Sequence, residues 1–600
     1  MKRSLFDVLN LAVLAAVMLL ALASYATVVP GTCLRKFSSY DELVAFVKAS
    51  MEREYSFSAD QAYVLKLQGG DRGSSDYSST NVQVQGVDEA DIAKTDGERI
   101  YVAFHDKVYI VQAYPPEEAR LLSSIRVSGH VLGLFVNGNK LVVLAIGYGG
   151  IQLSGTSVIV SRTILLVYDV SNAEYPVLDR SVAVSGMYLS SRMIGDYVYL
   201  VTNMPAAYYE NSELIVALPS LCVDGEAKDV EASEVYYSTV HSSYYSYITV
   251  VAVNVRSEEE PSYLSVLAGA STCMYVSKKN MYLASPVFAC SFLGGSDKME
   301  LHKILLEDGS ISYVASGSVP GRVLNQFSMD EYQGYLRVAT TTGRVARSFE
   351  RSTSANHIFV LDEQLRIVGR LENVAPGERI YAARFLGERC YLVTFKKVDP
   401  FFVISLEDPL RPEVLGWLKI PGYSDYLHPY GENYVIGIGK ETVEAEEGDF
   451  AWYQGVKVSM FNVTDVSHPV ELSKIVIGDR GTDSEALRDH KALLFDERKH
   501  LMAMPILLAL REGCEECPPN TPGRLVWQGL YVFNVSERGV VLVGNVTHLP
   551  EGASDDLFQY SEYFVRRALY IGSVLYTVSE AMVKMNDLYT LAELGTVELR

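Results

Sequence analysis

Short apolar runs alternate with polar turns along most of this chain. In each copy of the pattern, a turn rich in Gly, Asn or Asp separates two strand-like runs, and Val, Leu, Ile and Tyr dominate the second run. The turn residues supply the positive φ angles that tight hairpins need, and the apolar runs suit a half-buried pleated surface. Nine such hairpins are predicted, at 94–102, 135–143, 193–201, 385–393, 429–436, 495–502 and 569–576, with looser copies around 278–280 and 331–334.

Several of these hairpins are followed by a second pair of strand-like runs, at 165–171, 402–407, 459–464 and 531–536. Four strands per unit and a mean spacing of about 59 residues between turns are typical of β-propeller blades. A row of β-sandwiches would need linkers roughly every hundred residues, and none is visible. The sequence therefore predicts an all-β fold, with residues 81–600 forming a single large β-propeller of about eight to nine four-stranded blades.

Three stretches interrupt the repeat, at 203–247, 440–455 and 505–528. The first is rich in Tyr and Ser, and the second places acidic residues beside Trp452 and Tyr453. Insertions between strands project from one rim of a propeller, where function commonly resides. An acidic loop is also an ordinary solvated loop, so both interpretations stay open.

The N-terminus carries the basic pair Lys2-Arg3 followed by an apolar stretch of 19 residues from Leu11 to Val29. At about 1.5 Å per residue this stretch approaches the roughly 30 Å thickness of a bilayer core, with the basic pair on the cytoplasmic side. Residues 1–34 are therefore predicted to be a signal peptide cut after Ala26 or a retained hydrophobic signal-anchor helix. In both cases the rest of the chain is exported, either secreted or tethered to the membrane.

Residues 35–80 are predicted to connect this segment to the propeller. Ser39 and Glu42 form a capping box, and the apolar residues that follow fall on one face of a helix. From 52 to 80 the chain is polar, with Gly-rich and Ser-rich parts. We expect one short amphipathic helix and then a polar linker.

Export affects how the cysteines are interpreted. Six of the seven lie beyond the predicted signal or anchor segment 1–34, an even number that an oxidising exterior permits to pair. Cys514 and Cys517 form an isolated CxxC without the second pair that a zinc site would need. We favour a local disulfide between them that pins a surface loop, with free thiols as the alternative.

Asn462, Asn534 and Asn545 each begin an Asn-X-Ser/Thr sequon, which is usable only in an exported chain. Asn462 and Asn534 occupy the position that Asp169 holds in the second repeat unit. An Asx-type turn therefore explains both residues without a sugar, and glycosylation stays an open alternative.

Longer motifs add a resemblance to a known family. They are Thr80–Gly97, Leu324–Gly343, Pro421–His428 with Gly437–Thr442, and Asp483–Lys491. Together they resemble motifs of prokaryotic secreted or membrane-anchored proteins with a C-terminal β-propeller domain distantly related to WD repeats. The resemblance runs from about Ser39 to the C-terminus and implies an exported propeller. The family has no agreed activity, so it assigns no catalytic or binding residue.

Two of these motifs are acidic. Asp88 and Asp91 in the first, and Asp483 and Glu485 in the last, offer carboxylate oxygens of the kind that Ca²⁺ binds. Neither group follows the Asp-x-Asp-x-Asp-Gly order of a calcium loop. We predict no metal and no cofactor, with these four residues as the candidates if Ca²⁺ does bind, and a structural role at the entry to the first blade is preferred.

The innermost strand of a blade lines the central channel. Several repeat units carry polar residues at the positions that correspond to this strand. They are Arg192, Asn325, Gln326, Arg384, His428, Asp489 and His490. One interpretation is that these residues bind a small ligand or ion. The interpretation that we prefer is that they solvate the channel and form hydrogen bonds with neighbouring inner strands. His428 and His490, with Asp425, Asp483 or Asp489, are the candidates for acid–base catalysis.

Composition narrows the function further. The chain is 48% apolar, and its net charge of −21 without a Lys/Arg run argues against nucleic acid as a partner. No HExxH, GxSxG or GxxxxGK(S/T) motif is present, and no GxGxxG opens a helix. The leading hypothesis is an extracytoplasmic scaffold that binds a surface protein or glycan and is not an enzyme. The alternatives are a hydrolase or lyase acting on surface polysaccharide or peptide, and a structural envelope protein.

Overall fold

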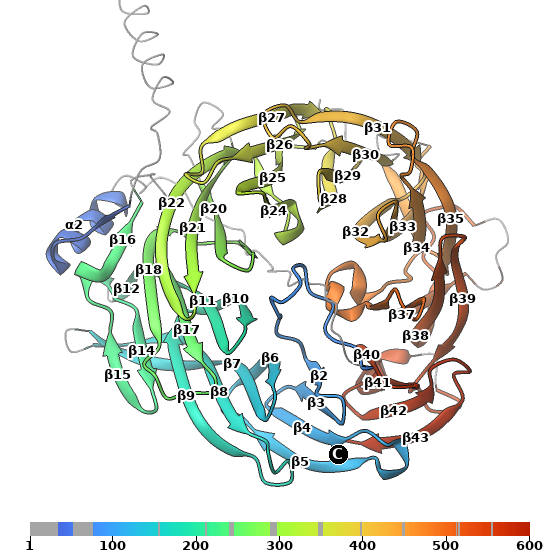
Figure 1. Cartoon of the computed structure of the whole chain (residues 1–600), viewed down its shortest axis with the longest axis horizontal. Helices are drawn as coiled ribbons and strands as arrows, with labels where there is room; N and C mark the ends of the chain where they lie inside the picture. The colour runs from blue at the N-terminus through green and yellow to red at the C-terminus, as the bar shows by residue number, and fades with distance from the viewer. Residues whose placement is uncertain are drawn as a thin grey trace, which may run out of the picture.

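In the computed structural model, the described residues form nine antiparallel blades arranged in a ring (Figure 1). The described ranges are 34–51, 76–153, 156–210, 213–238, 245–287, 297–345, 352–396, 399–446, 450–511, 513, 517–553 and 556–599. Residues 1–33 of the predicted signal or anchor segment (1–34) and residues 52–75 of the predicted linker lie outside them. The predicted all-β propeller is confirmed, at the upper end of the expected blade number.

The first five blades run from the channel outward in chain order. Blade 1 contains β2 (Ala93–Thr95), β3 (Arg99–Phe104), β4 (Lys107–Gln112) and β5 (Arg120–Arg126), and blade 2 contains β6 (His130–Asn137), β7 (Lys140–Leu153), β8 (Thr156–Asp169) and β9 (Val177–Ser185). Blade 3 contains β10 (Met187–Ile194), β11 (Tyr197–Pro205), β17 (Tyr245–Asn254) and β18 (Ser262–Gly269). Blade 4 contains β19 (Cys273–Val276), β20 (Asn280–Val287), β21 (Lys298–Glu307) and β22 (Ser310–Pro320). Blade 5 contains β24 (Met329–Tyr332), β25 (Tyr335–Thr342), β26 (Ala355–Leu361) and β27 (Ile367–Val374), with β23 (Arg322–Val323) also paired to β25.

The last four blades follow the same order. Blade 6 contains β28 (Arg379–Leu386), β29 (Arg389–Phe395), β30 (Asp399–Ser405) and β31 (Glu413–Ile420), and blade 7 contains β32 (Tyr423–Tyr430), β33 (Tyr434–Glu444), β34 (Ala451–Asn462) and β35 (Val470–Ile477). Blade 8 contains β36 (Leu494–Asp496), β37 (Leu501–Leu510), β38 (Arg524–Ser536) and β39 (Gly539–Val546), and blade 9 contains β40 (Arg567–Ile571), β41 (Val574–Val578), β42 (Met582–Asp587) and β43 (Glu593–Glu598). Short 3₁₀ helices lie between strands: η2 (Pro116–Glu118), η4 (Gln326–Ser328), η5 (Glu485–Leu487), η6 (His490–Ala492) and η7 (Leu557–Tyr563).

The predicted hairpins join the first and second strand of each blade. Gly195 and Gly387 adopt φ angles of 57° and 53° in two of these turns, a conformation that glycine enters without steric cost. The apolar runs after the turns become second strands buried along most of their length, because each blade is covered on both faces by its neighbours.

Apolar clusters fill the spaces between successive blades. One of them joins blades 1 and 2, and equivalent clusters occupy the following junctions around the ring. The last cluster joins blade 9 to blade 1, where the Tyr576 hydroxyl also donates a hydrogen bond to the Ala113 carbonyl at 2.7 Å. Each terminal blade takes its four strands from one continuous segment, so side-chain packing closes the ring without an exchanged strand.

The two faces of the ring differ. The face that carries the connections between first and second strands and between third and fourth strands has short turns, and we call it the turn face. The opposite face carries the connections between second and third strands, which include all three predicted insertions, and we call it the insertion face. The insertion of blade 3 forms β12 (Ala207–Glu210), β13 (Glu213–Val216), β14 (Ser220–Val223), β15 (Glu226–Asp229), η3 (Ala232–Glu234) and β16 (Val235–Tyr237). Of these, β14 pairs with β9 of blade 2 and β16 pairs with β18.

The segment before the propeller packs on the outer edge of blade 3 (Figure 1). Strand β1 (Arg35–Lys36) pairs with β16, and helix α2 (Tyr40–Met51) follows. The Glu42 amide donates to the Ser39 hydroxyl at 3.2 Å, and Leu43 is fully buried against the blade 3 insertion. The predicted short amphipathic helix is thus confirmed. Within the ranges that the structure describes, no helix is long and apolar enough to cross a bilayer.

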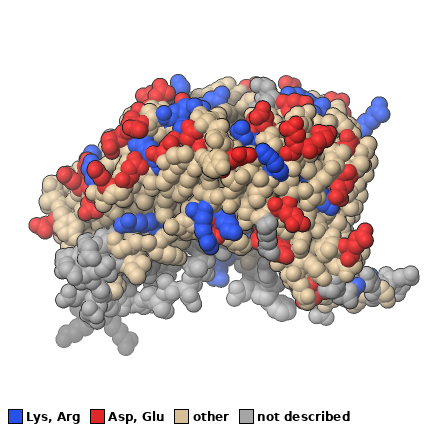
Figure 2. All heavy atoms as spheres, turned by 90° about the horizontal axis from the view of Figure 1, so that it is seen from below, with Lys and Arg blue, Asp and Glu red and all other residues tan. Residues whose placement is uncertain are grey.

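Exposed carboxylates are concentrated on the turn face. Figure 2 shows the ring from its edge, with most of the acidic side chains in view along one side. Those exposed in the turns are Glu98, Glu117, Glu118, Glu174, Asp196, Glu258, Glu259, Glu260, Glu307, Asp308, Glu363, Glu388, Glu407, Asp408, Glu432, Asp465 and Glu537. The turn face therefore carries many of the exposed acidic residues of the chain.

Closure by packing predicts that the junction of blades 1 and 9 is sensitive to a cavity. Tyr576→Ala removes a fully buried ring and its hydrogen bond, so we expect the free energy of unfolding to fall by about 3–5 kcal/mol. Tyr589→Ala in the same blade removes a ring that is 63% exposed and serves as the control. Urea denaturation followed by circular dichroism measures both variants. Equal stability of the two variants would show that this junction does not hold the ring closed.

Candidate functional site

Residues 76–92 run through the central channel, and we call this segment the plug. Figure 1 shows the segment before β2 looping into the middle of the ring. Its apolar residues Val82 and Val87 are 3% and 1% exposed. The first strand of blade 1 begins at Ala93, so the chain crosses the channel before it enters the ring.

The plug is fixed by backbone hydrogen bonds to three separate blades. The Ser78 amide donates to the Tyr570 carbonyl of blade 9 at 2.9 Å. Asp88 and Met193 of blade 3 exchange two bonds of 2.8 and 2.9 Å, and Asp91 pairs with Leu134 of blade 2 in the same way. These single bridges pair backbone groups that would otherwise be buried without partners in the channel.

Side chains of the plug contact two further blades. The Asn81 amide nitrogen donates to the His490 carbonyl at 2.8 Å, and the Gln83 amide nitrogen donates to the carbonyls of Gln326 and Met329, both at 3.1 Å. The plug therefore spans the channel from blade 9 to blade 5 and touches blades 2, 3 and 8 as well.

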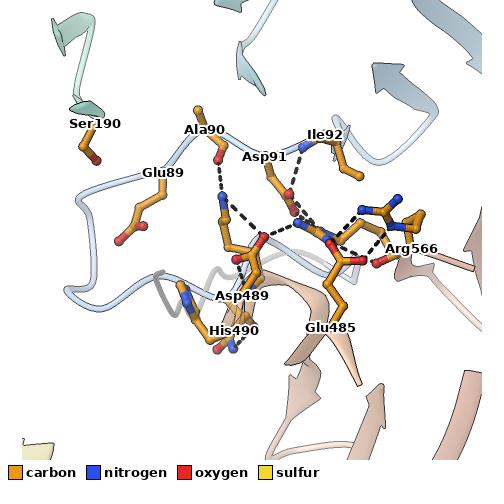
Figure 3. Close-up of polar contacts among 12 residues, drawn as sticks. Glu89, Ala90, Asp91, Ile92, Ser190, Glu485, Asp489, His490 and Arg566 are labelled. Carbon is orange, nitrogen blue, oxygen red and sulfur yellow. Dashed lines mark hydrogen bonds and ion pairs between the residues drawn. The ribbon is translucent and has the colours of Figure 1, made fainter. Parts of the chain in front are cut away.

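A buried ionic cluster ties the plug to blades 8 and 9 (Figure 3). The Arg567 guanidinium donates to Asp91 of the plug at 2.9 Å, to Glu485 at 2.8 Å and to Asp489 at 2.5 Å. We call these four residues the Arg567 cluster. The Arg567 side chain is 4% exposed, and the neighbouring Arg566, which is 43% exposed, binds Glu485 from the outer side at 2.6 Å.

Charge pairing offsets the cost of burial in this cluster. Burial opposes ionisation of Glu485, but the guanidinium groups of Arg567 and Arg566 hold its pKa down at about 2. Removing one partner of such a network leaves an uncompensated buried charge, which is far costlier than the loss of a surface pair. The cluster thus fixes both the plug and the segment that carries η5 and η6.

A second buried pair lies between the plug and blade 3. The Glu89 carboxylate lies 3.3 Å from the Arg192 guanidinium, and the Gln326 amide donates to the same carboxylate oxygen at 3.3 Å. Arg192 also donates to the Gln326 side-chain oxygen at 2.9 Å. Burial raises the pKa of Glu89 to about 7, against the attraction of Arg192 and Lys491.

The residues predicted to line the channel differ in their surroundings, and some of them contact the plug. Arg192, Gln326 and the His490 carbonyl contact the plug directly. Asn325 caps η4, where its side-chain oxygen accepts from the Phe327 amide at 3.1 Å. Arg384 and His428 lie between aromatic side chains, with the Arg384 guanidinium 4.9 Å from the centre of the Phe327 ring and the His428 ring 4.1 Å from that of Phe495.

The candidate acid–base residues are held in other interactions. His490 is 1% exposed, and burial together with the positive charges of Lys491, Arg384, Arg192 and Arg567 holds its pKa well below the usual range. The Asp489 carboxylate binds Arg567, and the Nδ1 atom of His428 lies 3.0 Å from the Tyr426 hydroxyl. In this geometry Asp489 stabilises a guanidinium and does not orient a histidine.

The four candidate metal ligands each have a cationic partner within the protein. The pairs are Asp88 with Lys94 at 2.7 Å, Asp91 with Arg567 at 2.9 Å, Asp483 with Arg488 at 2.5 Å and Glu485 with Arg566 at 2.6 Å. Across the described ranges, no three His, Cys, Asp or Glu residues are grouped so as to hold a metal ion.

The structure describes Cys517 and the three sequon asparagines among the predicted covalent sites. Cys517 is disulfide-bonded, whereas Cys514 lies outside the described residues. The Asn462 side chain accepts a hydrogen bond from the Thr464 amide at 2.9 Å, as Asp169 does from the Ser171 amide at 2.9 Å, so the Asx turn is present. Asn534 and Asn545 are exposed.

One pocket on the insertion face was not predicted from the sequence. It has a volume of about 390 Å³ and lies where blades 6 and 7 meet, and we call it the aromatic pocket. Blade 6 contributes Arg379, Tyr381, Phe395 and Lys396, blade 7 contributes Trp452 and Tyr453, and the connection to blade 8 contributes Arg480. The only sequence signal was the pair Trp452-Tyr453 in the second insertion, because its partners lie some 70 residues earlier in the chain.

Comparisons with known proteins found a family model, two archaeal relatives and a solved structure. A family model described as a beta propeller domain matches residues 77–591, a range that begins in the plug. An uncharacterized protein of Methanocaldococcus jannaschii is 29% identical over 584 residues, which cover 85% of this chain and 82% of that protein. An uncharacterized protein of Archaeoglobus fulgidus is 29% identical over 514 residues, which cover 72% and 75%. A solved hypothetical selenium-binding protein from Sulfolobus tokodaii aligns with a TM-score of 0.27 and 11% identity, over 63% of this chain and 75% of its own.

The Arg567 cluster predicts a large difference between two adjacent arginines. Arg567→Gln leaves three carboxylates around the site without their shared cation, so we expect a loss of about 3–5 kcal/mol in the free energy of unfolding. Arg566→Gln removes a half-exposed partner of Glu485, and a loss of about 0–1 kcal/mol is expected. Urea denaturation of the two variants measures this difference. A small effect of both substitutions would contradict the structural role of the cluster.

The raised pKa of Glu89 predicts a pH dependence. Between pH 4.5 and about 7 the folded protein holds a proton on Glu89 that the unfolded chain has released. The stability from this proton is fully present below pH 4.5 and is lost as the pH rises through about 7. Relative to Glu89→Gln, the wild-type protein should therefore lose stability over this range and then level off.

Denaturation midpoints of wild type and Glu89→Gln, taken from pH 4 to pH 8, measure this difference. Glu98→Gln, which changes an exposed glutamate in the first turn, is the control and should track the wild type. A constant offset between wild type and Glu89→Gln at every pH would refute the assignment.

Proposed function

Because the chain belongs to the beta propeller domain family, we propose that it works as an extracytoplasmic binding scaffold that captures a surface protein or glycan on its insertion face. The observation that carries this proposal is the plug. The channel of a propeller is a common place for a ligand, but here a segment of the same chain occupies it. Binding is therefore assigned to the surface.

The choice of face rests on the loops. All three insertions leave the ring on the insertion face, and long connections on a rigid scaffold are where binding residues concentrate. The turn face has short connections and many exposed carboxylates. We therefore interpret it as a hydrated surface and not as the binding surface.

A membrane tether is part of the proposal. Strand β1 and helix α2, which follow the predicted apolar segment in the chain, pack at the outer edge of blade 3. Export and retention at the membrane are part of the proposal, and they rest on the basic-then-apolar order of residues 2–29.

The proposal is tested by blocking each face of one blade in turn. Glu444→Cys places a thiol on the insertion face of blade 7, and Glu432→Cys places one on the turn face of the same blade. Each variant is modified with a polyethylene glycol maleimide, and saturable binding to surface fractions of the source organism is measured. We expect modification at 444 to abolish binding and modification at 432 to leave it intact, with the wild-type protein treated alike as the control.

Loss of binding with the modification at 432, or no saturable binding by the wild-type protein, would overturn the proposal. Topology is measured separately with protease added to intact cells. Digestion of the propeller is expected, and full protection of it would contradict export.

A further inference from the structure

We propose that the aromatic pocket binds an acidic sugar, namely a uronic acid or similarly carboxylated pyranose within a surface glycan. This inference rests on the proposed function, because it names a ligand class for the insertion face. It is argued from three features of the described lining, which are two guanidinium groups without a carboxylate partner among the described residues, packed aromatic rings, and the absence of Asp and Glu from the described lining residues.

Two guanidinium groups of the pocket have no carboxylate partner in the described part of the chain. Arg379 donates to the Tyr381 hydroxyl at 2.9 Å and lies 4.8 Å from the centre of that ring. Arg480 donates to the Tyr453 carbonyl at 3.1 Å and lies 5.0 Å from the centre of the Trp452 ring. Both are held in place by neutral groups, so their positive charge remains available to an anion. Arginine binds a carboxylate through two parallel hydrogen bonds, which also fixes its orientation.

The walls of the pocket are aromatic rings packed against one another. The lining residues Phe395 and Tyr453 both pack against Tyr423, a buried residue that does not line the pocket, at ring distances of 4.9 and 5.2 Å. Tyr381 packs edge-on against Phe395 at 5.4 Å. Tyr and Trp offer rigid contact surface that is apolar on its face and polar at its edge, at a small cost in entropy. A pyranose matches this surface, since it has apolar C–H faces and hydroxyl groups at its edge.

The charge of the pocket is opposite to that of the chain as a whole. The chain has 73 acidic and 52 basic residues, yet none of the described residues that line the pocket is Asp or Glu, and three are Arg or Lys. The nearby Glu378 carboxylate accepts a hydrogen bond from the Thr394 hydroxyl at 2.5 Å. A site that concentrates cations in an acidic protein selects for an anionic ligand.

The combination of features favours an acidic sugar over other anions. A free phosphate would use the guanidinium groups and leave the aromatic walls without a contact. An acidic peptide would be recognised along an extended groove, whereas this cavity of about 390 Å³ is sized for a small cyclic group. A uronic acid uses both elements, with its carboxylate on a guanidinium and its ring face on an aromatic side chain.

The test is isothermal titration calorimetry on the whole purified protein. The probes are oligosaccharides of glucuronate and of galacturonate, their neutral glucose and galactose counterparts of the same linkage, inorganic phosphate, and a poly-glutamate peptide. We expect at least one uronate oligosaccharide to bind at least tenfold more tightly than its neutral counterpart and than either other anion. Arg379→Gln and Trp452→Ala should each weaken that binding at least tenfold.

Trp417→Ala is the matched control, because Trp417 is 55% exposed and Lys419 lies 5.5 Å from its ring centre, outside the pocket. It should bind like the wild type, and circular dichroism checks that all three variants are folded. Equal binding of neutral and acidic sugars, preference for phosphate or peptide, or absence of uronate binding would each overturn the assignment. Surface binding that is blocked at 444 but accompanied by no uronate binding would leave the proposed function standing and reject only this ligand class.

Discussion

The ion pair between Asp91 and Arg567 joins the plug to blade 9, and the placement of the plug in the channel depends on it. A ring of nine blades surrounds a wider channel than a ring of fewer blades would, and the plug runs through that channel. A buried segment brings backbone groups and carboxylates that must be paired. The ring supplies those partners from blades that are hundreds of residues apart in sequence.

This constraint explains why so many polar residues face the channel. Arg192 forms an ion pair with Glu89, and Gln326 donates a hydrogen bond to the same carboxylate. Arg567 forms ion pairs with Asp91, Glu485 and Asp489. Removing the plug would take one carboxylate from each of these buried cations, Asp91 from Arg567 and Glu89 from Arg192, so the plug and the inner strands form one structural unit. The remaining surface is divided into an acidic turn face and an insertion face with a cationic, aromatic pocket.

Local signals predicted the blades well. Hairpins such as that at Gly195 and the Asx turn at Asn462 depend on neighbouring residues alone, and their spacing revealed four strands per blade. The position of Arg192 on the innermost strand also marked it as a channel residue, and it contacts Glu89 of the plug. The capping box at Ser39 predicted α2 for the same reason, because each of its partners lies within a few residues.

Long-range contacts could not be predicted in this way. Residues 80–97 were recognisable as a motif, but their contacts are single bridges and ion pairs with distant blades, so the motif gave no sign that it fills the channel. Asp88 and Asp91 therefore attracted a metal hypothesis, whereas their partners in the fold are Lys94 and Arg567. The aromatic pocket was missed because its two halves come from different blades.

The central claim is that the plug is a permanent part of the folded ring. Hydrogen–deuterium exchange of the wild-type protein tests it most directly, through the backbone amides of Ser78, Asp88 and Asp91, each of which donates to a blade carbonyl. The structure predicts that these amides exchange as slowly as those of the buried second strands β3 and β11. Exchange at the rate of unprotected amides would show that the segment does not stay in the channel and would contradict the account.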